Sequence, residues 1–124
     1  LQCTSPMRSG IDIDRAIDKI QAEKSDSLLS VSPSHKFIWE ETNSDVHSIN
    51  YDFFRRPRRQ EMSRQYVENG SIYIFKPWVL KELGNRLGGK ISLFPMSTIA
   101  AWEIDSELDL EIVEFLLKRG SNVH

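Results

Sequence analysis

Apolar residues recur at two spacings along this chain, and the spacings predict where its helices and strands lie. The i, i+3, i+4, i+7 spacing of an amphipathic helix appears at Ile13, Ala16, Ile17 and Ile20. Ser9 is placed to cap this helix, and we expect it to fade near 24–25. A short, mostly apolar strand follows at 27–31, and Pro33 is expected to close it. This order is typical of the second half of a βαβ unit, with Leu1 as the end of its first strand.

The segment 34–68 has neither spacing. Isolated aromatic residues alternate with polar ones, so we expect short hairpin-like strands and loops, an excursion from the α/β pattern. Asn69-Gly70 is then expected to turn the chain. The stretch "SIYIF" at 71–75 is apolar on both faces, as a central parallel strand should be.

The last third predicts two helices separated by strands. "PWVLKELGNRL" opens with Pro77 in a first helical turn and should stop at Gly88-Gly89. "ISLFPM" predicts a strand and "AWEID" a shorter one. In "SELDLEIVEFLLKRG", Ser106 and Asp109 form a capping box and Gly120 lies just past the helix end. The pattern as a whole predicts an α/β fold with a mainly parallel sheet.

Composition narrows the class of protein. The 124 residues make one domain, and 40% hydrophobic content with three Trp and six Phe is enough for a packed core. A net charge of −2 argues against a general nucleic-acid binder. The single cysteine, Cys3, suits a reducing compartment, and no apolar run or leader suggests a membrane or export, so we expect a cytoplasmic protein. Because the chain opens at Leu1 without Met, we expect it to be a piece of a longer one.

Four arginines around Pro57 are the first candidate for chemistry: Arg55, Arg56, Arg58 and Arg59. A guanidinium fork matches a carboxylate or phosphate with two hydrogen bonds, which favours a site for an anionic ligand. The alternatives are a solvated loop or a basic patch of the nuclear-localisation type, because charge clusters on loops are commonly just solvated.

Two carboxylates are the second candidate. If "AWEID" is a strand, Glu103 and Asp105 share a face with about 7 Å between their α-carbons. Two hard oxygen ligands at a strand end suit Mg²⁺ carried in with a substrate phosphate. The alternative is that Asp105 or Ser106 caps the next helix and Glu103 is solvated.

The opening "LQCTSPMR" is the third candidate, a polar strand-to-helix turn of the kind that borders the ligand crevice of open α/β sheets; a helix cap and turn is the alternative. The histidines His35, His47 and His124 have no metal spacing, and no nucleophile–His arrangement is legible. Tyr73 and Asn69 alone would pass as core and turn residues.

Taken in order, these segments resemble one family. "LQCTSPMR" is similar to the LQPTSPLR of the acylneuraminate cytidylyltransferases, "PRRQ…YVENGSIYI" to their R-Q…NG-x-IYI segment, and "EIDSELD" to their DIDTELD. The matches keep their order and spacing over nearly all 124 residues. The resemblance implies a nucleotide-diphosphosugar transferase fold. It also implies transfer of CMP from CTP to a nine-carbon, sialic-acid-like 2-keto sugar acid, with Mg²⁺ as cofactor and pyrophosphate as second product.

The resemblance also implies roles for single residues. Gln2, Arg58, Asn69 and Tyr73 would bind the sugar acid, with the sugar carboxylate as the target of Arg58. Glu103 and Asp105 would bind the metal, and Asp105 and Arg58 would be the catalytic residues. The segment 34–68 corresponds to a dimerisation segment that reaches toward the partner's sugar site, which implies a homodimer.

Several departures from the family pattern sharpen this picture. Cys3 replaces a proline, Glu103 replaces an aspartate, and a sugar-site lysine falls at Glu40 unless Lys36 serves in its place. The last two favour a branch that acts on legionaminic or pseudaminic acid. The family's Gly/Ser/Lys/Arg-rich loop for the CTP phosphates has no counterpart here and would precede Leu1. Residues 1–124 would therefore be the C-terminal portion of one domain, without the nucleotide-binding half and inactive by itself.

Two other functions compete with this one. A non-catalytic module could keep the fold to bind a sugar acid or to dimerise, and an upstream phosphate loop in the gene would argue against it. A Kdo-type cytidylyltransferase is disfavoured, because "NG-x-IYI" is typical of the sialate group.

Overall fold

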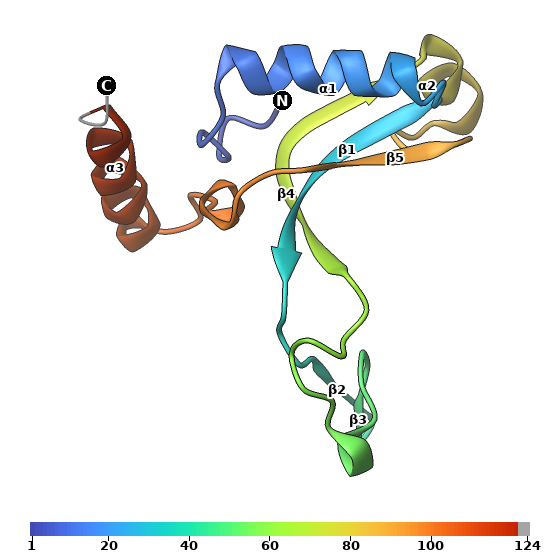
Figure 1. Cartoon of the computed structure of the whole chain (residues 1–124), viewed down its shortest axis with the longest axis vertical. Coiled ribbons are helices and arrows are strands. Elements are labelled where there is room, and N and C mark those ends of the chain that lie inside the picture. Colours follow the sequence, from blue (N-terminus) through green and yellow to red (C-terminus); the bar gives the residue numbers. More distant parts are fainter. Residues whose placement is uncertain (122–124) are drawn as a thin grey trace.

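A three-stranded sheet forms the centre of the molecule in the computed structural model, which describes residues 1–121. The strand order is β4-β1-β5, with β1 (Ser27–Ser34) in the middle (Figure 1). β5 (Ile91–Pro95) runs parallel to β1, and β4 (Gln65–Phe75) runs antiparallel to it. The α/β class is thus confirmed, but the sheet is mixed. The prediction that "SIYIF" is a central parallel strand is wrong for the described residues, where it is the second half of antiparallel β4.

Helix α1 (Gly10–Ala22) covers one face of this sheet, as its apolar spacing predicts. Ser9 caps it in a capping box with Asp12, which satisfies backbone donors at both positions. The side chains of Ala16 and Ile20 on α1 pack against Leu28 and Ile72 of the sheet to form the hydrophobic core. The helix ends at Ala22, two residues before 24–25, where it was expected to fade.

Strand β1 continues beyond the point where Pro33 was expected to close it. Pro33 pairs with Tyr66 of β4, whereas the pairing with β5 ends earlier, at Val31 and Pro95. Beside Pro33 the sheet has only one neighbouring strand, so the missing N–H of proline breaks no bond to β5. The proline is compatible with the strand because it lies where β1 has become an edge.

Asn69-Gly70 is not a turn but an irregularity inside β4. The pairing register between β1 and β4 shifts between Leu29 and Val31, and Gly70 has a φ of +65°. The buried Asn69 side chain fills the interrupted ladder: its amide Nδ2 donates to Ser32 Oγ (3.0 Å), and its Oδ1 accepts from Ser30 Oγ (2.6 Å). Asn-Gly supplies a positive φ in a bulge as readily as in a turn.

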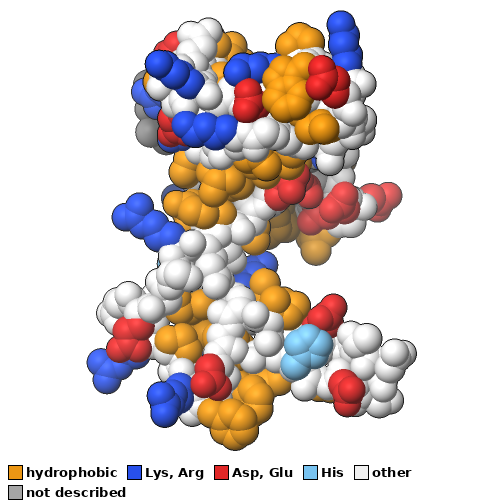
Figure 2. All heavy atoms as spheres, turned by 90° about the vertical axis from the view of Figure 1, so that its right-hand side faces the viewer, with side chains coloured by type: hydrophobic (Ala, Val, Ile, Leu, Met, Phe, Trp, Pro, Cys, Tyr) orange, Lys and Arg blue, Asp and Glu red, His pale blue; other side chains and the backbone are white. Residues whose placement is uncertain are grey.

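Residues 35–64 form a projection that we call the arm. It contains the hairpin β2 (Trp39–Thr42) and β3 (Asp45–Ser48) and the 3₁₀ turn η1 (Phe53–Arg55), as expected for an excursion from the α/β pattern. Its aromatic rings stack in a chain with centroid distances of 4.2 to 5.9 Å: Phe37, Tyr51, Trp39, Phe53 and Phe54. Figure 2 shows hydrophobic side chains exposed at the lower end of the molecule, where the arm lies.

The C-terminal third departs from prediction in two places. Helix α2 (Pro77–Leu83) stops at Gly84, which takes a left-handed conformation, before the expected stop at Gly88-Gly89. The expected strand "AWEID" is absent: the turn η2 (Thr98–Ala101) leads into an irregular segment. Helix α3 (Glu107–Ser121) follows, capped as predicted by Ser106 and Asp109, and runs one residue past Gly120. None of the helices in residues 1–121 has the length and apolar character needed to cross a membrane.

Candidate functional site

The N-terminal loop, residues 1–8, lies against the irregular segment 102–105 near the other end of the chain. The Ile104 N–H donates to the carbonyl of Thr4 (2.8 Å), and the buried Ser5 hydroxyl donates to Glu103 Oε1 (3.3 Å). Arg8 donates to the carbonyls of Gln2 (3.0 Å) and Ser5, so its guanidinium holds the loop in shape. Two of the three segments predicted to carry chemistry are therefore brought together.

Gly70 lies where these two segments meet β4. A Cβ placed on it would stand within 3.0 Å of Gln2 Oε1, Glu103 Oε1 and Ser5 Oγ. Only glycine fits this position, because a side chain would displace the polar atoms and the φ of +65° disfavours other residues. Gln2 and Glu103, both predicted site residues, thus converge on one backbone position.

The side chain of Asn69, the neighbour of Gly70, forms its hydrogen bonds within the sheet. Asn69 is 1% exposed, and its Oδ1 accepts from the Ser71 N–H (3.2 Å) as well as from Ser30 Oγ, while its Nδ2 donates to Ser32 Oγ. The structure therefore gives Asn69 a supporting role below the site, and its contact with a substrate stays a prediction.

Tyr73 lies further along β4, beside Glu68 and Arg86. Its hydroxyl donates to the Glu68 carboxylate, and the Arg86 guanidinium lies 3.9 Å from its ring centroid. Burial, and then the hydrogen bond to Glu68, raise the pKa of the phenol to about 12, while the nearby Arg86 acts in the opposite direction. Tyr73 is therefore a neutral donor at any physiological pH.

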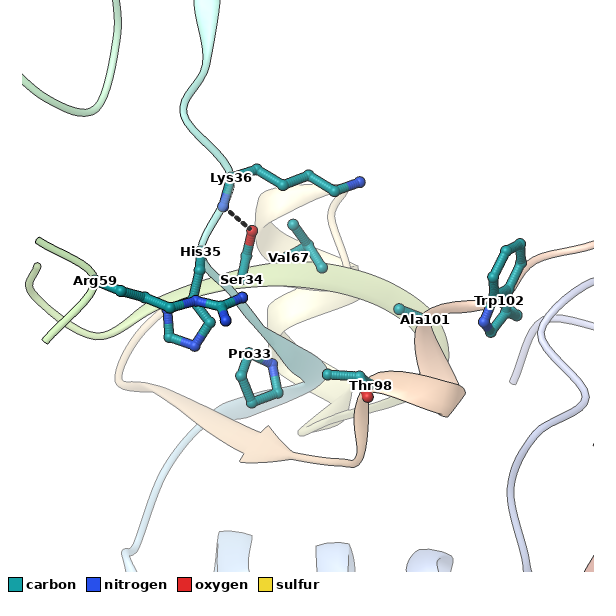
Figure 3. A pocket seen from close by; sticks show the side chains of 9 residues that line it. All are labelled: Pro33, Ser34, His35, Lys36, Arg59, Val67, Thr98, Ala101 and Trp102. Carbon is teal, nitrogen blue, oxygen red and sulfur yellow. Dashed lines mark hydrogen bonds between the residues drawn. The ribbon is translucent and has the colours of Figure 1, made fainter. Parts of the chain in front are cut away.

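A pocket of about 430 Å³ opens where the arm joins the sheet (Figure 3). No carboxylate lines it, and its charged groups are cationic. Its lining consists of Pro33, Ser34, His35, Lys36, Arg59, Val67, Thr98, Ala101 and Trp102. Neither Lys36 nor Arg59 has an ion-pair partner among the described residues. The pocket is therefore suited to an anion.

The four arginines of the arm separate into different environments. Arg56 stacks on the Phe37 ring at 4.4 Å, and Arg59 lines the pocket. Arg58 is exposed outside that lining, and its backbone N–H donates to Glu61 Oε2 (3.0 Å). The sugar-acid role of Arg58 stays a prediction. The arginine that lines the pocket is its neighbour Arg59, to which the family motif assigned no role.

The same pocket distinguishes Lys36 from Glu40. Lys36 lines the pocket, whereas Glu40 lies on the hairpin, where its Oε2 is 2.9 Å from His47 Nε2. In this structure Lys36 is thus the residue of the two that is placed to meet an anionic ligand.

The predicted metal ligands Glu103 and Asp105 do not lie on a strand, so the strand geometry expected for them is wrong. The Ser106 hydroxyl caps α3, and Asp105 takes part in the cap only through its backbone N–H, which donates to Asp109. The exposed Asp105 carboxylate therefore has no partner among residues 1–121. No cluster of three or more Asp, Glu, His or Cys in that range could enclose a cation. Two carboxylates still fit Mg²⁺ chemically, since this ion is commonly held by one or two carboxylates together with waters and substrate phosphates.

Comparison with known proteins places these features in a larger context. The sequence matches no family model. It is 33% identical to the post-translational flagellin modification protein B of Campylobacter coli, over 95% of this chain and 51% of that protein. It is 34% identical to N-acylneuraminate cytidylyltransferase B of Danio rerio, over 92% of this chain and 28% of that protein.

A third relative matches a shorter segment more closely. The CMP-N,N′-diacetyllegionaminic acid synthase of Campylobacter jejuni is 48% identical over 59 residues, which are 48% of this chain and 25% of that protein. The chain therefore spans about half the length, or less, of the curated relatives it matches.

Proposed function

We propose that this chain, which is related to the acylneuraminate cytidylyltransferases over more than nine-tenths of its length, is the sugar-acid and metal-binding part of such an enzyme. The resemblance predicted from the sequence motifs is confirmed by these relatives. The proposed reaction transfers CMP from CTP to a nine-carbon 2-keto sugar acid. The convergence of Gln2 and Glu103 on Gly70, at positions that match the family motifs, is the observation that supports it most strongly.

In this reaction the anomeric hydroxyl oxygen of the sugar acid attacks the α-phosphorus of CTP. The new oxygen–phosphorus bond forms as the bond to pyrophosphate breaks, and the hydroxyl proton passes to solvent. Magnesium, when bound by Glu103 and Asp105, would neutralise negative charge on the phosphates. The protein's main contribution would be to position the two substrates and to stabilise this charge.

The chain's own residues would orient the sugar acid. Gln2 offers an amide beside Gly70, and the neutral Tyr73 hydroxyl, whose proton is donated to Glu68, would accept a hydrogen bond from the sugar acid without adding charge. Arg58 on the arm would bind the carboxylate, with Lys36 and Arg59 supplying further positive charge in the pocket. If the arm mediates a homodimer, as we propose, these cations also come within reach of the partner's site.

Two substrate classes are suggested by the relatives. The Danio rerio protein is named for an N-acylneuraminate, and the Campylobacter jejuni protein for a diacetylated legionaminic acid. We propose a legionaminic-type acid for this chain, which the 48% identity to the second protein over 59 residues supports. Since the chain spans half its relatives or less, we propose that CTP turnover needs residues beyond these 124, and that the chain alone binds the sugar acid without converting it.

Mutation of Asp105 tests the metal assignment in a protein of the relatives' length. Asp105→Asn keeps the shape but removes a charge, so initial rates should fall by orders of magnitude while the melting temperature changes little. Glu103→Asp should be tolerated better than Glu103→Gln. Glu107→Gln, an exposed carboxylate two residues away, is the matched control.

The measurement is the initial rate of pyrophosphate release as Mg²⁺ is titrated. If the Asp105→Asn curve coincides with those of the wild type and Glu107→Gln, Asp105 does not bind a catalytic metal. If the wild-type protein releases no pyrophosphate with any nine-carbon sugar acid, the chain is a binding or dimerisation module instead.

A further inference from the structure

The Ser5 hydroxyl joins the N-terminal loop to one oxygen of the Glu103 carboxylate. Ser5 is 1% exposed, and its Oγ donates to Glu103 Oε1 at 3.3 Å. Among residues 1–121 this carboxylate is the one hydrogen-bond partner of the hydroxyl. The other carboxylate oxygen, Oε2, has no hydrogen-bond or ion-pair partner in the same range. Glu103 is therefore held at one oxygen and open at the other.

The N-terminal loop fixes Ser5 and the backbone beside Glu103 at the same time. The Ser5 carbonyl accepts from the Arg8 guanidinium, which holds the loop in shape. The adjacent Thr4 carbonyl accepts from the Ile104 N–H (2.8 Å). Because the segment around Ile104 is not part of a strand, these contacts replace a sheet ladder in setting the direction of the Glu103 side chain.

Gly70 leaves the space in which the hydrogen bond between Ser5 and Glu103 forms. A Cβ on Gly70 would stand 2.5 Å from Glu103 Oε1 and 2.8 Å from Ser5 Oγ. Both distances are too short for a non-bonded carbon and oxygen, so any larger residue would displace the two oxygen atoms. The glycine and the buried hydroxyl thus constrain the same carboxylate oxygen.

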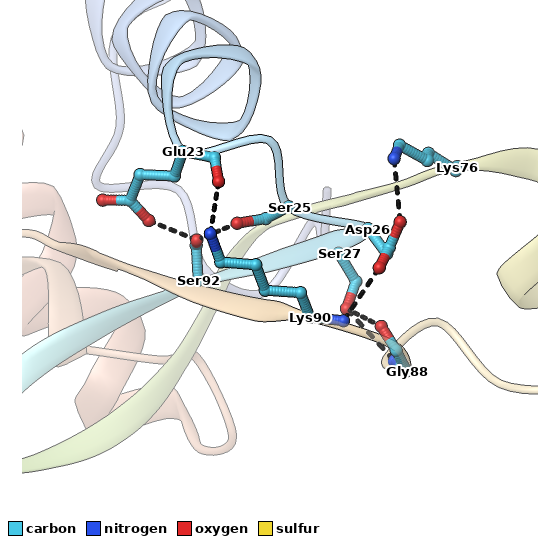
Figure 4. Close-up of polar contacts among 8 residues, drawn as sticks. All are labelled: Glu23, Ser25, Asp26, Ser27, Lys76, Gly88, Lys90 and Ser92. Carbon is cyan, nitrogen blue, oxygen red and sulfur yellow. Dashed lines mark hydrogen bonds and ion pairs between the residues drawn. The ribbon is translucent and has the colours of Figure 1, made fainter.

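A second buried serine donates to a glutamate elsewhere in the molecule, and the comparison singles out Glu103. Ser92, which is 4% exposed, donates to Oε2 of Glu23, the residue that follows α1 (Figure 4). The other oxygen of Glu23, Oε1, lies 2.8 Å from the Lys19 ammonium, so both of its oxygens are paired within the protein. Glu103 has the buried serine but no such cation, which leaves Oε2 available to a positive ion.

We propose that Ser5 is a positioning residue for a divalent cation, because it occupies Oε1 of Glu103 and presents Oε2 alone to the ion. The proposal rests on the proposed function, since it takes Glu103 as a metal ligand, and it deepens that function by assigning the choice of ion. Hydrogen bonds to a metal ligand orient the ligand and tune its affinity. Ca²⁺ can take both oxygens of one carboxylate, whereas Mg²⁺ demands strict octahedral geometry and keeps several waters. A glutamate with one free oxygen therefore favours Mg²⁺ over Ca²⁺.

Titration of the 124-residue chain with Mg²⁺ alone and with Ca²⁺ alone tests this assignment. The NMR chemical shift of the Ile104 amide, next to Glu103, reports the affinity for each ion. The titrations compare the wild type with Ser5→Ala, with Glu103→Gln and with the double variant. Ser5→Ala is nearly isosteric, and the melting temperature of each variant checks that the fold is kept.

Two control variants separate this role from a general effect on the fold. Thr4→Ala changes an exposed side chain next to Ser5 and keeps the carbonyl that binds Ile104. Ser92→Ala also removes a bond between a buried serine and a glutamate, but at Glu23. Both controls should keep the wild-type ratio of Mg²⁺ to Ca²⁺ affinity.

We expect Ser5→Ala to weaken Mg²⁺ binding about fivefold and Ca²⁺ binding less than about twofold, so that the ratio of the two affinities falls. The expected loss is below the roughly ten- to hundredfold typical of residues that orient metal ligands, because the 3.3 Å bond is long for an O–H···O contact. In the Glu103→Gln background, Ser5→Ala should have no further effect, since the ligand that it orients is already lost.

The possible failures are distinguishable. An equal or larger loss for Ca²⁺, no loss for either ion, the same loss in the Glu103→Gln background, or an equal fall of the ratio in a control overturns the role of Ser5 and leaves the metal assignment standing. If neither ion shifts the Ile104 amide of the wild type, or if Glu103→Gln binds Mg²⁺ as tightly as the wild type, the metal assignment of the proposed function fails together with this inference.

Discussion

The sheet and the arm differ in what their apolar side chains touch. In the sheet, Leu28 and Ile72 are at most 1% exposed and pack under α1. In the arm, Trp39 is 47% exposed and Phe54 is 85% exposed, although each ring packs against the ring of Phe53. The sheet can be stable by its own contacts, whereas the arm leaves the kind of apolar surface that proteins usually cover with a partner.

The difference shows how the proposed site would combine two regions of the molecule. The sheet and the loops that contact it position Gln2, Tyr73 and Glu103 through hydrogen bonds to Ser5 and Glu68 and through close contacts at Gly70. The arm supplies exposed cations, Lys36 and Arg59, beside the sheet. The sheet and its loops would thus fix the positions of side chains, and the arm would supply positive charge. Mutations in each of the two regions can test this comparison.

The largest effect is expected from a truncation in the sheet core. Leu28→Ala should lower the free energy of unfolding by about 3 kcal/mol, because it removes buried methyl groups and leaves a cavity. Val46→Ala, at a 60% exposed position of the arm hairpin, should change it by less than about 0.5 kcal/mol. Urea denaturation of both variants measures the contrast, and equal losses would mean that the arm has a core of its own.

The next effect concerns association. Phe54→Ser should weaken the proposed dimer by about 2 kcal/mol, roughly thirtyfold, if the exposed ring is an interface anchor. Light scattering at micromolar concentration should then report a shift from dimer to monomer. Phe115→Ser, at a 63% exposed position of α3, is the matched control, and a shift in that variant alone would place the interface on α3.

A smaller effect is expected at the arginines of the arm. Arg58→Lys removes one of two parallel hydrogen bonds to a carboxylate, so sugar-acid affinity should fall about tenfold while CTP affinity is kept. Steady-state kinetics of a protein of the relatives' length would measure both. Comparison with Arg59→Lys shows which of the two neighbours binds the carboxylate, and equal effects on both substrates would exclude Arg58 from that role.

The smallest effect is a pH dependence at the edge of the sheet. The Lys76 ammonium, and then the Lys90 N–H, lower the pKa of Asp26 below its usual value of 3.8. A lowered folded-state pKa gives stability that is present above the usual value and lost as pH falls through the folded one. Asp26→Asn should therefore flatten the decline in melting temperature below pH 4. A decline as steep as that of the wild type would show that Asp26 contributes nothing to it.

Local signals predicted much of the fold. The helix from Gly10 to Ala22 was legible because its cap and its apolar face lie within a single stretch of sequence. The arm was recognised because neither the helical nor the strand spacing of apolar residues continues through it. Pro33 and Asn69-Gly70 were misplaced because each depends on a distant strand: the end of β5 in one case, and the hydroxyls of Ser30 and Ser32 in the other.

Prediction of the candidate site from the sequence met the same limit, because contacts between distant residues were not predicted. Motif similarity singled out Tyr73, which lies on β4, and Gln2 and Glu103, which the fold brings beside Gly70 of the same strand. It assigned the sugar carboxylate to Arg58 and gave no role to Arg59, whereas the folded arm places Arg59, and not Arg58, in the lining of the pocket. The contact of Arg86 with the Tyr73 ring was not predicted, because no local pattern in the sequence encodes it.

The contact between the N-terminal loop and Glu103 has a consequence for the order of folding. Ser5 and Glu103 are 98 positions apart in sequence, so their hydrogen bond closes nearly the whole chain into a ring. Contacts of such separation add to the contact order, and they are entropically costly until other structure has shortened the path between their ends. We expect β1 and α1 to form first and the Thr4–Ile104 bond to form last. During refolding, protection of the Ile104 amide from hydrogen exchange should therefore lag behind that of the β1 amides, so the site would appear only once the rest of the molecule is complete.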